Sequence, residues 1–163
     1  METIQEQDKK VSPKDVFLHL LAIITLYISS ITFLVLIFQY INIYFPDALN
    51  GGYYAIESAY SSIRFAIATL VVVFPVYIFT TRFLNKSYES NPTKRNIRIR
   101  KWLVYFTLFV AALVVIGDLV TLIYNLLGGE VTIRFLLKAS TVLFVVVSVF
   151  TYYFSDLKKY KTE

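Results

Sequence analysis

Long apolar stretches separated by short polar segments dominate this sequence. Four of them cover about residues 13–45, 56–84, 100–127 and 130–155. A helix needs about 20 residues to cross the hydrocarbon core of a bilayer, and each stretch is longer than that. The pattern predicts an all-α integral membrane protein with four transmembrane helices in one domain over residues 13–157.

Polar segments and helix-ending residues separate the stretches. Ser12 and Pro13, followed by Asp15, form a typical helix start. Gly128-Gly129 predicts a tight turn between the last two helices, and Pro75 predicts a kink inside the second because proline lacks a backbone donor. The remaining polar parts are a tail over 1–12, a basic loop over 85–99 and a basic tail over 158–163.

Basic residues are concentrated in three of these polar parts. All but three of the 16 Lys and Arg residues lie before the first stretch, around the 85–99 loop or after the last stretch. The segment 46–55 has none. By the positive-inside rule, both chain ends and the 85–99 loop are cytoplasmic. We expect this basic face to attract anionic lipid and not nucleic acid.

Two segments of the sequence resemble each other. Ser62-Ile63-Arg64-Phe65 opens the second stretch, and Thr132-Ile133-Arg134-Phe135 opens the fourth. A similar Ile-Tyr pair precedes each Gly-Gly pair. These matches suggest two tandem helical hairpins of the same orientation, although apolar helices also match one another by chance.

The composition excludes several kinds of chemistry. The chain has no cysteine, so it cannot form disulfides, thiolate nucleophiles, iron–sulfur clusters or cysteine zinc sites. Its single histidine, His19, cannot supply two haem ligands. No catalytic or cofactor motif is present, and we predict no enzyme activity, no cofactor and no metal. His19 is either a pH switch or lone axial ligand, or a hydrogen-bonded residue between helices.

Charged residues inside the third and fourth stretches are candidates for function. Glu130, Arg134 and Lys138 are four residues apart and share one helix face. At about 1.5 Å per residue, Lys138 and Asp118 lie roughly 12 and 15 Å below the same surface. Each charge alone costs about 2.5–3.5 kcal/mol in hydrocarbon, so we predict that Asp118 and Lys138 pair. The pair would be either an ion relay or cavity floor, or a structural contact between helices.

Two arginines are candidates for a second site. Arg64 and Arg134 each lie near the start of an apolar stretch, on the side of the membrane opposite the 85–99 loop. Together they could form a basic outer mouth for an anion or a lipid head group. The alternative is that each anchors its helix by extending toward the interface.

The sequence resembles a family of small bacterial and archaeal membrane proteins, the domain of unknown function 5671, most specifically from Arg100 to Tyr153. The resemblance extends from about residue 14 to 157. This chain departs from the family late in the fourth stretch, where it has Val146-Val147-Ser148 and the family is expected to have a small residue. It implies a four-span membrane domain and draws attention to Asp118, Arg134 and Lys138, but it brings no activity. The motifs that carry it are Arg100-Lys101-Trp102-Leu103, Gly117-Asp118-Leu119-Val120, Leu127-Gly128-Gly129-Glu130, Thr132-Ile133-Arg134-Phe135 with Lys138, and Tyr152-Tyr153-Phe154.

These observations favour a non-enzymatic subunit or scaffold of a membrane assembly, or a homo-oligomer, in the inner membrane of a prokaryote. The alternative is a small transporter or channel that uses Asp118, Lys138 and Arg134. A membrane-embedded enzyme is the third hypothesis, and it is disfavoured because no nucleophile–base set or metal-ligand cluster is visible.

Overall fold

The chain forms four long helices. The computed structural model describes residues 12–46, 53–90, 98–129 and 131–159, and it contains no strand within them. The helices are α1 (Pro13–Tyr44), α2 (Tyr53–Ser90), α3 (Arg98–Leu127) and α4 (Ile133–Lys159). All four are long and apolar enough to cross a membrane. The predicted all-α, four-span membrane architecture is confirmed.

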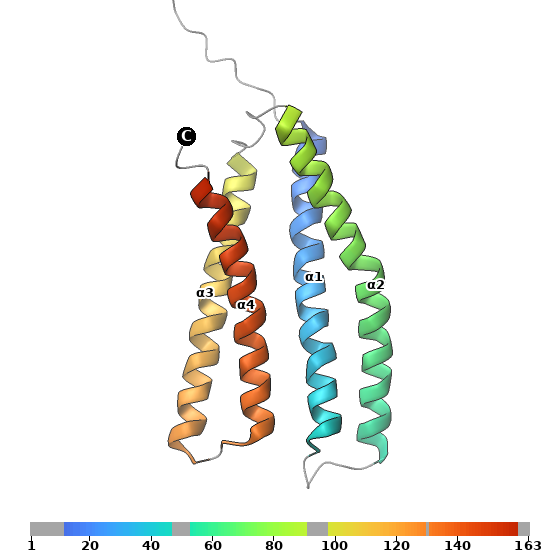
Figure 1. Cartoon of the computed structure of the whole chain (residues 1–163), viewed down its shortest axis with the longest axis vertical. Coiled ribbons are helices and arrows are strands. Elements are labelled where there is room, and N and C mark those ends of the chain that lie inside the picture. Colours follow the sequence, from blue (N-terminus) through green and yellow to red (C-terminus); the bar gives the residue numbers. More distant parts are fainter. Residues whose placement is uncertain (1–11, 47–52, 91–97, 130, 160–163) are drawn as a thin grey trace, which may run out of the picture.

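The helices form two hairpins, α1–α2 and α3–α4 (Figure 1). We call the end where α1 begins and α4 finishes the proximal end, and the opposite end the distal end. The α1 backbone lies close to all three other helices, whereas α2 approaches only α1 among the described helices. Small and polar side chains of α1, such as Ala22 and Ser29, are buried and let the neighbouring helices come close.

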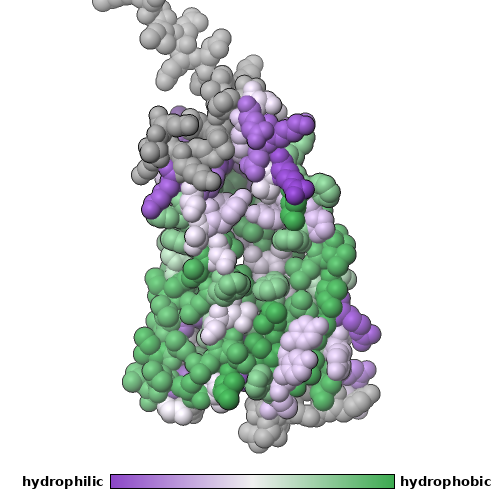
Figure 2. Space-filling view, in the orientation of Figure 1, coloured by the Kyte–Doolittle hydropathy of each residue, from purple (hydrophilic) through white to green (hydrophobic). Residues whose placement is uncertain are grey.

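The polarity of the molecule is reversed relative to a soluble bundle. Large apolar side chains such as Phe65, Phe79 and Phe144 are exposed, while small residues such as Ala66 and Thr107 are buried. Figure 2 shows apolar residues over the middle of the visible face and hydrophilic residues toward its ends. Several hydroxyls within the helices bond the carbonyl four residues earlier, as Thr107 does with Leu103, so they need no water.

The helix ends differ in detail from the predicted limits. α2 continues to Ser90, although the predicted stretch ends at residue 84. The extension is polar in sequence, but Leu84 and Tyr88 are one turn apart and pack together against Ala22 of α1. Ser12 precedes α1 as predicted, but its side chain makes no capping hydrogen bond.

Two residues with special backbone chemistry shape the bundle. Pro75 lies inside α2, which bends near its middle (Figure 1). Proline cannot bond the carbonyl of Val71, so the helix opens there. Gly129 has a φ of 71°, and its amide bonds the Leu126 carbonyl at 3.2 Å, which closes the α3–α4 turn.

Candidate functional site

Polar side chains from all four helices gather at the proximal end. They surround a small hollow of about 70 Å³, which we call the proximal cavity. Its polar lining residues are His19 of α1; Tyr77, Thr81, Asn85 and Tyr88 of α2; Arg100 of α3; and Tyr152, Tyr153 and Asp156 of α4.

A hydrogen-bonded histidine joins α1 to α2 at this cavity. The Nδ1 atom of His19 lies 2.6 Å from the carbonyl oxygen of Asp15. A carbonyl can only accept, so Nδ1 carries a proton and the neutral ring accepts the Tyr88 hydroxyl proton at Nε2. Both side chains are buried. His19 is therefore a hydrogen-bonded residue between helices, as the second sequence-based alternative predicted.

An ion pair joins α3 to α4 at the same level. Arg100 donates a hydrogen bond from Nη2 to Oδ2 of Asp156. The two side chains are 13% and 28% exposed, so water screens the pair only in part. The Arg100 guanidinium also lies over the Tyr88 ring, 5.1 Å from its centroid. Tyr88 therefore connects the α1–α2 contact to the α3–α4 contact.

Tyrosine side chains form much of the remaining wall. The rings of Tyr152 and Tyr153 meet edge to face at 5.2 Å, and both side chains interact with Tyr77 of α2. The side chain of Thr81, also on this wall, interacts with Tyr77 as well. With about 30 Å³ per water molecule, the cavity holds roughly two waters or one small polar group. The arrangement can thus bind a compact group that accepts hydrogen bonds.

A second polar contact lies toward the distal end, between α1 and α4. Arg134 donates two hydrogen bonds to Oδ1 of Asn42, at 3.1 Å from Nε and 2.7 Å from Nη2. One turn along both helices, the Lys138 ammonium lies 5.5 Å from the centroid of the Phe38 ring. Arg134 and Lys138 thus share one face of α4, as their spacing predicts, and this face contacts α1.

The structure does not form the predicted ion pair between Asp118 and Lys138. Lys138 contacts Phe38 of α1, and the Oδ2 atom of Asp118 is buried with no hydrogen-bond partner in the described part of the chain. The rise per residue of the two helices places Asp118 and Lys138 at similar depth in the membrane. A contact also requires that both side chains point toward each other. Glu130, the remaining member of the predicted cluster, lies outside the described residues.

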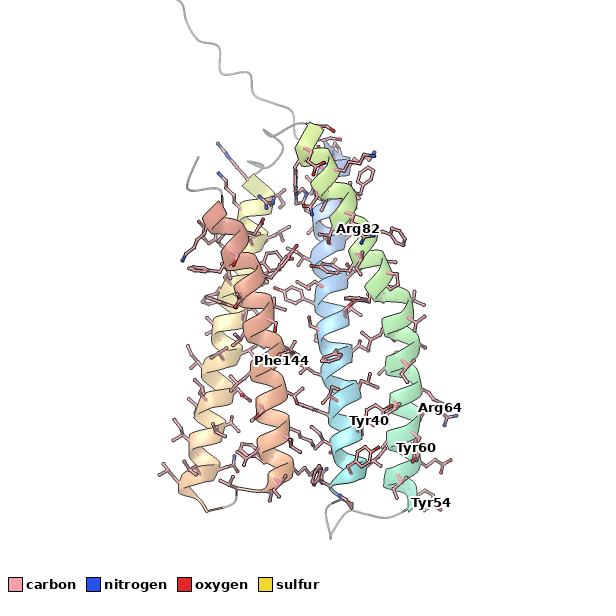
Figure 3. The ribbon with its side chains drawn as sticks, viewed as in Figure 1. Tyr40, Tyr54, Tyr60, Arg64, Arg82 and Phe144 are labelled. Atoms are coloured by element: carbon pink, nitrogen blue, oxygen red, sulfur yellow. The ribbon has the colours of Figure 1, made fainter. Side chains whose placement is uncertain are left out.

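Nor does the structure bring Arg64 and Arg134 together in one basic mouth. Arg64 is exposed and points away from the bundle on α2, at the end where Tyr54 and Tyr60 lie (Figure 3). Its Nε atom donates to the Tyr60 carbonyl at 3.4 Å. Arg134 instead bonds Asn42 of α1. The geometry of Arg64 fits the alternative, an interfacial anchor among tyrosines.

Three residues that connect the helices at the proximal site, like most of its lining, were missed as site residues in the sequence. Tyr88 lies beyond the predicted end of its helix. Arg100 was noted only as a cytoplasmic charge and as part of a family motif, and Asp156 lies beside a basic tail. The four-residue spacing of Leu84 and Tyr88 is a signal for a longer α2. Nothing in the sequence indicates that Tyr88, Arg100 and Asp156 meet. Within the described residues, no three His, Asp or Glu side chains group as metal ligands.

Comparison with known proteins gives a family but no function. The family described as Domain of unknown function (DUF5671) matches residues 15–153. The matched region contains every polar residue that lines the proximal cavity except Asp156. No curated protein and no solved structure matches the chain.

Proposed function

The chain belongs to the DUF5671 family of unknown function, and we propose that this multi-pass membrane protein is a non-enzymatic subunit of a membrane assembly. The assembly is either a homo-oligomer or a complex with other membrane proteins. One observation carries the proposal: polar groups of the four helices bind each other at the proximal end, while large apolar side chains cover the outside.

The lateral surface supports a role in assembly. The α2 backbone approaches only α1 among the described helices, so much of its circumference is open to lipid or to partner helices. Its exposed side carries Phe65, Val72 and Phe79, and α4 exposes Phe144. Side chains of this kind pack equally well against acyl chains and against another transmembrane helix.

The state of the ionisable groups supports the non-enzymatic part of the proposal. His19 uses both ring nitrogens in hydrogen bonds, and Arg100 and Asp156 bind each other. Groups that must transfer protons to a substrate need access to it. Here these three side chains connect helices, which fits a structural role.

We propose that the proximal end faces the cytoplasm of a prokaryotic cell, where its basic residues contact anionic lipid. Arg82, Lys86 and Arg98 lie at this end of the described helices. Because the chain has no native cysteine, a single introduced cysteine can be labelled specifically. Glu89→Cys reports the proximal side of the membrane, and Leu127→Cys reports the distal side. An impermeant maleimide applied to intact cells should label Leu127→Cys only. Labelling of Glu89→Cys alone would show that the proximal end faces the outside of the cell and would contradict the proposed orientation.

The assembly itself is tested by purification of the tagged chain from its native membrane in mild detergent. We expect a mass larger than one copy, made up of a homo-oligomer or of a stoichiometric partner. A monodisperse single copy without partner at native lipid content would reject the proposal. Light scattering with a refractive-index correction for detergent measures the protein mass, and mass spectrometry identifies any partner.

A transporter or channel is the second candidate, with Asp118, Lys138 and Arg134 along its path. The buried Oδ2 atom of Asp118, which has no hydrogen-bond partner within the described helices, favours it, since polar groups left inside a membrane often belong to ion pathways. Proton flux into liposomes would support this candidate if Asp118→Asn abolished the flux and kept the fold. Equal flux in the variant and the original protein would exclude a role of Asp118.

A further inference from the structure

A long apolar groove continues from the proximal cavity toward the middle of the membrane. It has a volume of about 680 Å³ and lies between α1 and α2, with Val145 of α4 on its border. Tyr77 lines both the groove and the proximal cavity. The polar hollow and the apolar hollow therefore meet at one residue.

The spacing of the lining residues shows that the two hollows are parts of one seam. On α1, residues 19, 22 and 23 line the cavity, and residues 26, 29, 30 and 33 line the groove. On α2, residues 88, 85, 84 and 81 line the cavity, and residues 75, 74, 71 and 70 line the groove. Steps of three and four residues keep one helix face, so the same faces form both hollows.

The groove part of the seam is open on its side, where Val71 and Phe74 line it and are 67% and 48% exposed. The backbones of α2 and α4 do not approach each other, and α2 bends at Pro75, which lies on the groove. A ligand can thus enter from the lipid phase without crossing the bundle. Because the groove is walled mainly by apolar side chains, the part of the ligand that fills it must be apolar.

One buried hydroxyl group on the seam has no hydrogen-bond partner among the described residues. Ser29 is 7% exposed, lines the groove, and its Oγ atom makes no hydrogen bond. Thr81 lines the cavity, and its side chain interacts with Tyr77. Buried polar groups normally have a partner, so the Ser29 hydroxyl points to a ligand or water that enters the seam.

The sizes of the two hollows limit the ligand. A groove of this volume is within the roughly 300–1,000 Å³ of small-molecule sites. The proximal cavity holds a group of only a few non-hydrogen atoms, which excludes a phosphoglycerol head group. Hydroxyl groups of Tyr77, Thr81, Tyr152 and Tyr153 line it, and hydroxyls can donate to an anionic oxygen.

We propose that the α1–α2–α4 seam binds one long-chain fatty acid, with the carboxyl group in the proximal cavity and the acyl chain in the groove. The chain would run past Tyr77, which lines both parts. The proposal adds a ligand site to the protein and does not depend on its being a subunit of an assembly.

Photo-crosslinking in nanodiscs tests the proposal on the full chain. The probe is palmitate with a diazirine in the middle of its chain, and mass spectrometry locates the modified residues. We expect modification to concentrate on the groove segments of α1 and α2, and unlabelled palmitate to suppress it. Even labelling over exposed residues such as Phe144 and Val72, without competition, would overturn the proposal.

Two neighbouring valines provide a matched pair of variants. Val71 and Val72 are 67% and 64% exposed, but only Val71 lines the groove. Val71→Trp should reduce competable labelling about tenfold, equivalent to about 1.4 kcal/mol of binding, while Val72→Trp should leave it unchanged. Ser30→Leu narrows the groove from α1 and provides a second variant if Val71→Trp does not fold. Undiminished labelling in a folded groove variant would reject the site.

Competition separates the possible sources of the acyl chain. Palmitate should compete more strongly than hexadecanol, which has the same chain without a carboxyl group, and Tyr77→Phe should reduce this difference. Phosphatidylcholine in the nanodisc should compete weakly. Stronger competition by phosphatidylcholine or hexadecanol than by palmitate would contradict the carboxyl assignment and overturn the proposal.

Discussion

His19 of α1 and Tyr88 of α2 are separated by 69 residues in the sequence and share a buried hydrogen bond at the proximal end. The ring of Tyr88 also contacts Arg100, which binds Asp156. One tyrosine therefore connects the polar contacts of all four helices. The consequences for stability can be measured one contact at a time.

Tyr88→Phe removes the hydroxyl that donates to His19. The Nε2 atom of His19 then remains buried without this donor, which should lower the free energy of unfolding by about 1–3 kcal/mol. Unfolding by SDS titration in detergent, followed by circular dichroism, measures the change. Tyr105→Phe, at an exposed position on α3, is the control and should have little effect. Equal effects of the two changes would show that the His19 contact contributes nothing.

Arg100 and Asp156 should be energetically coupled. Asp156→Asn and Arg100→Gln each leave a largely buried partner uncompensated, so each should destabilise the protein. The double variant should lose less than the sum, with a coupling of about 0.5–3 kcal/mol. A double-mutant cycle of unfolding free energies measures it. Additive losses would mean that the pair is formed without net stabilisation.

The two arginines in the similar segments should differ in their contribution to stability. Arg134→Gln weakens charge-assisted hydrogen bonds to Asn42, and we expect a loss of about 1.5–3 kcal/mol. Arg64 is exposed and bonds only a carbonyl of its own helix among the contacts described above. Arg64→Gln should therefore change stability by less than about 0.5 kcal/mol. The reverse order in an unfolding experiment would contradict the assigned contacts.

Asp118 and Lys138 should behave as independent residues. Lys138 contacts Phe38, and the buried Oδ2 atom of Asp118 has no hydrogen-bond partner among the described residues, so the structure shows no partner that the two side chains share. The effects of Asp118→Asn and Lys138→Met on unfolding should add to within about 0.5 kcal/mol in the double variant. Recovery of stability in the double variant would contradict this and support the ion pair between Asp118 and Lys138 that the sequence predicts.

Much of the fold was predictable because the bilayer imposes simple rules. The hydrocarbon core requires a long apolar stretch for each crossing, and a helix satisfies its backbone hydrogen bonds within itself. The four spans, the kink-forming Pro75 and the Gly129 turn therefore follow from local sequence. The predicted C-terminal end of α2 was less accurate. The turn that ends in Tyr88 is polar in composition and becomes helical through packing against α1.

The sequence by itself determined which residues enter the membrane and at what depth, because both depend on hydrophobic length and helical rise. Only the tertiary structure decided which side chains meet. Which side chains meet depends on the rotation of each helix about its own axis. In a membrane, where all helix surfaces are largely apolar, close packing and a few polar contacts determine this rotation. Lys138 thus meets Phe38 and not Asp118. The proximal cavity likewise exists only because four distant segments turn their polar faces toward one another.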